Sequence, residues 1–227
     1  MTESTYSFKP YHTVRMSSEY EFWLLDLDGT LVDVETSYIH EVGFEVGNRL
    51  GVSFTARQAE HLWYGFGGTR EQVFAETDID PHQFWATFHE VEEPEARADA
   101  THVYPDAARF IGEVDTPLGV VTHCQEFLTE PILDALDIAD WFDTIVCCDD
   151  ETGWKPDPRP LEMAMTDLGV AGNGHVGAMV GDDPQDVGAA RNAGLDGIHV
   201  ERHDLDRLGG SVDGDRHVTA LTDLIEG

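Results

Sequence analysis

The residues that could do chemistry begin with two aspartates one residue apart, directly after a short apolar run. The run 22–25 reads Phe-Trp-Leu-Leu, and it leads into Asp26 and Asp28, with Gly29 and Thr30 as turn residues. This pattern is typical of a buried strand that ends in a turn. A ligand crevice lies at the carboxyl ends of the strands of an open parallel sheet, and buried carboxylates there need a cation or hydrogen bonds. The alternative is a solvated turn that is rich in aspartate.

Two later apolar runs are also followed by residues that phosphoryl transfer would use. The run 118–122 ends in Thr122, whose hydroxyl could hold a phosphate oxygen, although threonine is common in strands for structural reasons. Lys155 comes after the run 144–148, and its ammonium could neutralise a carboxylate and a phosphate together. The alternative for Lys155 is a surface lysine in a proline-rich loop.

A cluster of carboxylates follows the run 176–180, just before a helix predicted over 184–193. Asp182, Asp183 and Asp186 offer the hard oxygen ligands that Mg²⁺ prefers, and Mg²⁺ usually takes one or two carboxylates. Asp182 is the better ligand because it lies directly after the strand. Asp183 and Asp186 either support the metal or cap the helix, since acidic residues are favoured in a first helical turn.

The elements that must position these residues alternate between strand and helix from residue 104 onward. Such repeated units with short links imply a parallel, doubly wound α/β sheet of the Rossmann-like kind. The expected strands are 22–25, 118–122, 144–148, 176–180 and, as the last of the core, 198–200. The expected helices are 105–111, 127–136, 158–168, 184–193 and, after a loop over 203–214, a closing helix over 218–225.

Residues 35–103 are predicted to form a separate helical insert without strands. Apolar residues recur at helical spacing over 38–50, and further helices are expected over 55–63, 69–76 and 81–93. We therefore expect a polar N-terminal extension over 1–20, a core domain of two segments, and a cap domain. The core segments are 21–34 and 104–227, and the cap is 35–103.

The order of the four signals, one at each strand end, resembles the four motifs of the haloacid dehalogenase superfamily. Asp-Leu-Asp-Gly-Thr-Leu-Val over 26–32 is similar to the first motif, and the stretch 188–194 resembles the helix after the fourth motif in the phosphoglycolate phosphatase-like group. The helical insert is similar to the mobile cap of that group. The resemblance implies the superfamily's core fold and a magnesium-dependent phosphatase, which is the activity of most members.

The resemblance assigns the catalytic and metal-binding roles to aspartates. Asp26 would be the nucleophile that forms an aspartyl phosphate, and it would also bind Mg²⁺. Asp28 would be the acid and base and would give its backbone carbonyl to the metal. Asp182 would complete the ligand set of Mg²⁺, supported by Asp183 or Asp186.

The resemblance also implies residues that hold the substrate. Thr122, Lys155 and Gly29 would bind the phosphate. The stretch 65–70, Gly-Phe-Gly-Gly-Thr-Arg, resembles the substrate-specificity loop of the cap, so Arg70 would reach a carboxylate or a second phosphate. The alternative for Arg70 is a surface arginine that starts a helix. The second motif often continues with asparagine, but His123 stands there, and we interpret it as a polar loop residue and not as catalytic.

Composition excludes several classes of partner. The 227 residues carry a net charge of −32, from 45 acidic and 13 basic residues, which would repel nucleic acid and anionic membranes. Lys9 and Lys155 are the only lysines, a composition that resembles proteins of salt-loving organisms. The 3 cysteines show no disulfide or metal-binding spacing, and no apolar run approaches the ~20 residues of a membrane span. We expect a cytoplasmic protein; its oligomeric state is not predicted.

The sequence favours a phosphatase that acts on a small phosphomonoester, either phosphoglycolate-like or a sugar phosphate. Asp28 argues against cleavage of carbon–halogen bonds, because family members with that activity lack the second aspartate. The cap contains no lysine for the Schiff base of phosphonoacetaldehyde cleavage. Two alternatives stay open: a sugar phosphomutase of the beta-phosphoglucomutase type, and a non-catalytic binding protein that kept the fold.

Overall fold

The computed structural model describes residues 20–65, 68–172, 174–203 and 212–225, and within them six strands form a sheet in which every neighbouring pair is parallel. The strand order is β5-β4-β1-β6-β7-β8. The strands are β1 (Phe22–Leu25), β4 (Leu118–Thr122), β5 (Thr144–Cys147), β6 (Gly177–Gly181), β7 (Asp196–Val200) and β8 (Arg216–Val218). Because β1 pairs with both β4 and β6, the carboxyl ends of these strands lie side by side, and the predicted fold class is confirmed.

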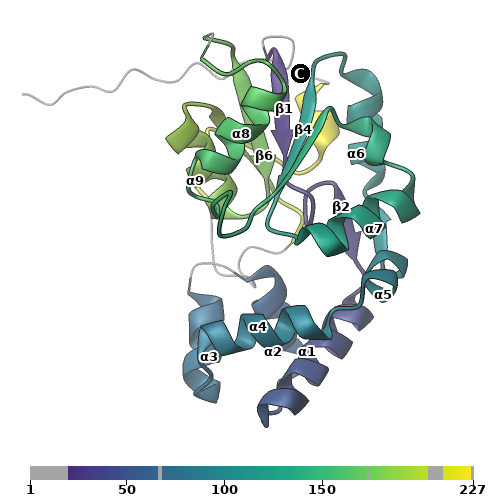
Figure 1. The fold of residues 1–227 in the computed structure, drawn as a ribbon, viewed down its shortest axis with the longest axis vertical. Helices are drawn as coiled ribbons and strands as arrows, with labels where there is room; N and C mark the ends of the chain where they lie inside the picture. The colour runs from purple at the N-terminus through teal and green to yellow at the C-terminus, as the bar shows by residue number, and fades with distance from the viewer. Residues whose placement is uncertain (1–19, 66–67, 173, 204–211, 226–227) are drawn as a thin grey trace, which may run out of the picture.

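Helices cover both faces of the sheet, with α8 and α9 on one side and α6 and α7 on the other (Figure 1). Trp23 of β1 packs edge-on against Phe110 of α6, with ring centroids 5.2 Å apart. Leu24, the next residue, points to the other face and shares a core with Leu161 of α8. One short buried strand thus anchors both layers. The helices are α6 (Pro105–Glu113), α7 (Glu126–Leu136), α8 (Arg159–Asp167) and α9 (Pro184–Ala193).

The residues between β1 and β4 include a group of helices that pack together at one end of the molecule, away from the sheet (Figure 1). Phe84 is fully buried at their centre, and its ring lies 5.3 Å from that of Phe74 and 6.0 Å from that of Phe54. These helices therefore have a hydrophobic core of their own, although the boundaries 35–103 of the cap stay a prediction. The helices are α1 (Thr36–Leu50), α2 (Ala56–Tyr64), α3 (Thr69–Thr77) and α4 (Pro81–Val91). The short helix α5 (Pro94–Asp99) packs instead on α7, where its Ala98 shares a core with Leu128 and Ile132.

The expectation of no strand within 35–103 was wrong. β3 (Thr101–Val103) pairs antiparallel with β2 (Val32–Val34), and the two short strands connect the helical group to the sheet domain. A strand of three residues is defined by its partner and not by a long apolar run, so the sequence pattern gave no sign of it. Helix α5 was not predicted either.

Two expectations near the C-terminus were also wrong. The run 198–200 is not the last strand, because β8 (Arg216–Val218) pairs with β7 at the edge of the sheet. The range 218–225 holds the end of β8 and a short 3-10 helix, η3 (Leu221–Leu224), instead of a closing α-helix. β8 contains an arginine and a histidine, so a search for apolar runs passes over it. Most of the predicted loop 203–214 lies outside the described residues.

The other predicted elements are confirmed with small shifts at their ends, and β4 and α9 match at both ends. The proposed N-terminal extension lies outside the described residues except for Tyr20. This residue belongs to the core, because it is buried, packs on Trp23 and donates a hydrogen bond to Asp196 at 2.9 Å. No helix in the described part of the chain has the length and apolar character needed to cross a membrane.

We predict that Gly177→Ala destabilises the protein by about 1–3 kcal/mol, because overpacking a rigid core has a cost of that size. A Cβ atom at Gly177 of β6 would lie 2.1 Å from the ring of the fully buried Phe22. The matched control is Gly112→Ala in α6, where a Cβ atom meets nothing within 4 Å. This control should be neutral or stabilising by up to about 1 kcal/mol, since alanine favours helices over glycine. Urea unfolding in molar KCl measures the stability of both variants. Equal stability would contradict the close contact between the Phe22 ring and Gly177.

Candidate active site

The floor of the candidate site is Asp26, the first residue after β1. Its side chain is almost buried, and its backbone N–H continues the sheet ladder by donating to the Val180 carbonyl at 2.9 Å. Burial raises the pKa of Asp26 above its ordinary value, while the neighbouring Lys155 opposes that shift. The carboxylate of Asp26 thus lies at the carboxyl edge of the sheet, where the sequence predicted it.

Lys155 is the cation of this site and reaches it from the loop after β5. Its side chain is buried, and its Nζ atom lies 2.7 Å from Oδ1 of Asp26 and 2.6 Å from Oδ1 of Asp186. It also donates a hydrogen bond to the Val121 carbonyl at 3.0 Å. Burial alone would lower the pKa of Lys155, but the carboxylates of Asp186 and Asp26 raise it above its ordinary value. The surface alternative for Lys155 is therefore wrong.

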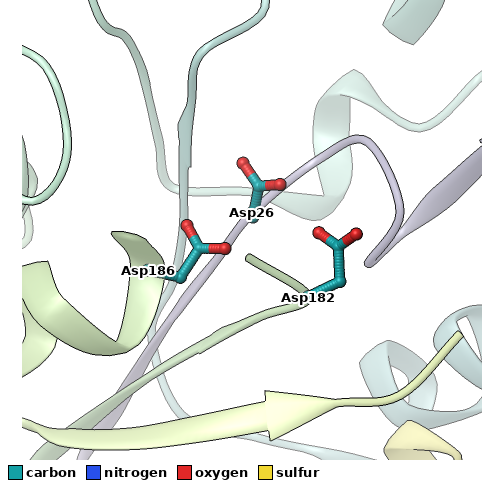
Figure 2. A group of neighbouring side chains, drawn as sticks. All are labelled: Asp26, Asp182 and Asp186. Atoms are coloured by element: carbon teal, nitrogen blue, oxygen red, sulfur yellow. The ribbon is translucent and has the colours of Figure 1, made fainter. Parts of the chain in front are cut away.

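Three carboxylates meet at this point, from Asp26, Asp182 and Asp186 (Figure 2). One oxygen of each lies within 4.8 Å of the others. Burial, together with repulsion from the other carboxylates, raises the pKa of Asp182, and burial raises that of Asp186 to about 7 although Lys155 opposes this shift. Among the described residues of the cluster, one ammonium faces three carboxylates. The surplus negative charge and the hard oxygen donors fit a divalent cation such as Mg²⁺.

The start of helix α9 fixes the positions of Asp183 and Asp186. Asp183 caps the helix by accepting a hydrogen bond from the Gln185 N–H at 2.8 Å, and Asp186 Oδ2 accepts one from the Asp183 N–H at 3.0 Å. This reciprocal capping turns Asp186 toward Lys155 and keeps Asp183 at the helix end. Asp186, and not Asp183, therefore joins the carboxylate cluster in the structure, and its support of a metal stays a prediction.

Two other residues predicted to bind phosphate, Thr122 and Gly29, lie at or just after the carboxyl ends of the neighbouring strands β4 and β1. Thr122 is buried at the end of β4, where its hydroxyl oxygen accepts a hydrogen bond from the Cys124 N–H at 3.0 Å. Gly29 has a φ of +72°, and a Cβ atom there would lie 2.3 Å from Oδ2 of Asp182. The Gly29 N–H already donates to the Val32 carbonyl at 2.8 Å. Gly29 thus allows the turn to approach Asp182, and its contact with phosphate stays a prediction.

A cavity of about 680 Å³ lies above the carboxylates, between the strand ends and the cap helices. Asp28 lies on its wall together with His123, whose Nε2 atom is buried without a hydrogen-bond partner among the described residues. Burial and the nearby charges of Lys155 and Arg70 lower the pKa of His123 to about 2, so its imidazole is neutral. The structure therefore brings His123 closer to the site than its interpretation as a loop residue implied.

Arg70 also lines this cavity, from the first turn of α3. Its Nη2 atom donates to the Trp63 carbonyl at 3.0 Å, and its Nη1 atom lies 4.0 Å from Oδ2 of Asp183. Its guanidinium lies 5.9 Å from the ring centroid of Trp85. Arg70 thus bridges the cap and the core beside the cavity, and its contact with a substrate stays a prediction.

Sequence reasoning missed most of the cap side of the cavity. Arg97 of α5 is almost fully buried and contacts the Asp28 carboxylate. Its Nε atom also lies 3.5 Å from Oε1 of Glu92. Burial raises the pKa of Glu92 to about 7, against the effect of Arg97. The only local signal was a cation in a chain that is poor in them. The other cap residues on the wall are aromatic or histidine, namely Trp63, Tyr64, His82, Trp85, Phe88 and His89.

We predict that Lys155→Met destabilises the protein in magnesium-free buffer by about 3–5 kcal/mol, because it leaves buried carboxylates without their counter-ion. The matched control is Arg159→Met, four residues later, which removes an exposed pair with Asp157 at 3.4 Å and should cost less than about 1 kcal/mol. Urea unfolding measures both variants. A loss for Lys155→Met as small as that of the control would show that the buried ammonium does not hold this cluster together.

Residues 23–200 match the family described as Haloacid dehalogenase-like hydrolase. The phosphoglycolate phosphatase of Agrobacterium fabrum is 30% identical over 190 residues, 78% of this chain and 78% of that enzyme.

Two solved structures below 25% identity show the same fold. A haloacid dehalogenase-like family hydrolase from Streptococcus pneumoniae has a TM-score of 0.72 at 18% identity, over 92% of this chain and 98% of that one. A mutant of CbbY from Rhodobacter sphaeroides, in complex with xylulose-(1,5)bisphosphate, has a TM-score of 0.62 at 22% identity, over 90% of this chain and 96% of that one. The prediction of a phosphatase-type enzyme is confirmed at that level, and the chain belongs to the haloacid dehalogenase-like hydrolase family.

Proposed function

We propose that this protein is a magnesium-dependent phosphatase that hydrolyses a small phosphomonoester through an aspartyl phosphate on Asp26. The observation that carries the proposal is the placement of Asp26. Its carboxylate lies at the floor of a cavity, 2.7 Å from a buried ammonium and beside two further carboxylates, with Asp28 on the cavity wall. A binding protein has no need of this charge arrangement together with a second aspartate.

The first chemical step transfers the phosphoryl group to the protein. A carboxylate oxygen of Asp26 attacks phosphorus, the bond between phosphorus and the ester oxygen breaks, and Asp28 gives its proton to the leaving alkoxide. Thr122 and Lys155 hold the phosphate during this step. Because the site contributes fixed charges and positions, catalysis relies on electrostatic stabilisation more than on new covalent chemistry.

The second step returns Asp26 to its free form. Asp28, now a carboxylate, takes a proton from a water molecule, whose oxygen attacks the phosphorus, and the bond between phosphorus and Asp26 breaks. Asp26, Asp182 and the Asp28 carbonyl would hold Mg²⁺, with Asp186 in support. When bound, Mg²⁺ supplies positive charge that offsets the negative charge of the phosphate and the carboxylates.

The substrate class follows from the cavity and from the relatives. The relative from Agrobacterium fabrum is a phosphoglycolate phosphatase, and CbbY was solved with a sugar bisphosphate. Both compounds carry a second anionic group, which Arg70 on the cap side of the cavity is suited to bind. A small phosphorylated metabolite with a carboxylate or a second phosphate is therefore the proposed substrate, in keeping with a cytoplasmic enzyme.

We predict that Asp26→Asn abolishes phosphate release, because an amide is not a nucleophile in this step. The measurement is phosphate release from phosphoglycolate, sugar phosphates and nucleotides in molar KCl, with and without Mg²⁺. The control is Asp140→Asn, an exposed residue before β5, at the opposite end of the sheet. If the folded wild-type protein releases no phosphate from any of these compounds, the result counts against a phosphatase. Isomerisation of glucose 1-phosphate would then identify a mutase.

We predict that Mg²⁺ raises the melting temperature of the wild-type protein, because a cation that binds only the folded state stabilises it by about 2.7 kcal/mol at 100 times Kd. Asp182→Asn should weaken this shift, since it removes one of the three converging carboxylates. The Asp140→Asn variant should keep the full shift. Thermal unfolding monitored by circular dichroism measures the effect without reference to activity, and equal shifts in all three proteins would place Mg²⁺ elsewhere.

A further inference from the structure

Arg97 is the cap-side residue that contacts the proposed acid and base. It lies in α5, and its Nη2 atom donates a hydrogen bond to Oδ1 of Asp28, 69 residues away in the sequence. Its Nη1 atom donates to the Thr101 hydroxyl at 2.8 Å, and its Nε atom lies 3.5 Å from Oε1 of Glu92. All three nitrogens of the guanidinium thus have protein partners.

The guanidinium is also fixed by aromatic rings of the cap. It lies 5.1 Å from the ring centroid of Trp63 and 6.0 Å from that of Tyr38, which are distances at which a cation is attracted to a ring. The Thr101 hydroxyl donates in turn to the Arg97 carbonyl at 2.7 Å. Arg97 therefore has one orientation, which is set by α1, α2 and β3 together.

The exposed fractions of the two side chains separate their roles. Both side chains line the cavity, but that of Asp28 is 29% exposed, whereas that of Arg97 is only 1% exposed. A substrate in the cavity would therefore contact Asp28, while the guanidinium nitrogens of Arg97 face protein groups. Arg97 is suited to act through Asp28 and not on the substrate itself.

We propose that Arg97 is a positioning residue that aligns the Asp28 carboxyl group with the leaving-group oxygen and makes this alignment depend on the packing of the cap. The proposal rests on the proposed phosphatase function. Its physical basis is that a planar guanidinium, held at its other nitrogens by Thr101 and Glu92, fixes the direction as well as the length of its hydrogen bond to Asp28, which the flexible ammonium of a lysine does not. A small misplacement of a catalytic group can cost about 10²-fold in rate.

The test compares two esters that differ in their need for an acid. An alkoxide must be protonated as it leaves, whereas p-nitrophenolate leaves without a proton, so a misaligned Asp28 should affect mainly the alkyl ester. The variants are Arg97→Gln and Arg97→Lys, and the substrates are p-nitrophenyl phosphate and the alkyl phosphate that the wild type cleaves fastest. The ratio of kcat/KM values is the readout, because it reports the transfer of the phosphoryl group to Asp26.

For Arg97→Gln we expect a loss of about 10²-fold on the alkyl phosphate and a much smaller loss on p-nitrophenyl phosphate. Arg97→Lys should recover part of the loss. Asp28→Asn should show the same dependence on the ester, and adding Arg97→Gln to it should cause little further loss. Arg49→Gln, which removes an exposed pair with Glu45 on α1, is the matched control and should leave both esters unaffected.

Equal losses on both esters, or full additivity of the Asp28 and Arg97 substitutions, would overturn the proposal and leave only a structural role for Arg97. Thermal unfolding shows whether Arg97→Gln folds. If it does not, the test uses Arg97→Lys, which keeps the charge, and compares its kcat/KM values on the two esters. Should the folded wild-type protein cleave neither ester, the phosphatase proposal fails, and the role of Arg97 fails with it. If the wild type is active and the Arg97 variants lose equal activity on both esters, the phosphatase proposal stands and only the proposed role of Arg97 is overturned.

Discussion

The buried contact between Lys155 and the carboxylates of Asp26 and Asp186 is the interaction on which the rest of the site depends. Without the ammonium, the protein would have to hold three carboxylates within a few ångströms of one another in a medium of low polarity, which strongly disfavours their charged forms. The ammonium has a further partner in the Val121 carbonyl, so its position is fixed by the backbone of β4. One cation does not balance three anions, and the remaining charge makes a bound divalent cation favourable.

The order of the strands is what allows this contact. β5, β4, β1 and β6 are neighbours and run parallel, so residues that follow them come together at one edge, although Asp26 and Asp186 are 160 positions apart in the sequence. Close approach at that edge also requires small residues, because a side chain at Gly29 would overlap Asp182. The capping of α9 completes the arrangement, since it turns Asp186 inward and leaves Asp183 at the helix end.

The reacting half of the site could be predicted because each residue follows a strand that is visible as an apolar run. The cap half could not, because Arg97 meets Asp28 through tertiary packing across 69 residues, and nothing near Arg97 in the sequence marks that contact. The same reason explains the missed elements. β3 and β8 have three residues each, and they exist through pairing with β2 and β7 and not through local propensity. The choice between Asp183 and Asp186 depended on side-chain direction at a helix end, which spacing alone does not fix.

This difference between the two halves has a chemical reason. A phosphoryl group always presents the same charges and geometry, so the residues that handle it are of few types and lie at fixed strand ends. The leaving group varies in shape, and in the proposed function it would meet cavity-wall residues such as Trp63, His89 and Arg70, which helix packing brings together. The type of reaction can therefore be predicted from local sequence motifs, whereas the identity of the substrate depends on how the cap helices pack. Arg97 joins the two halves through its contact with Asp28. In the proposed function, the residue that would protonate the leaving group is thus positioned by the part of the protein that would recognise that group.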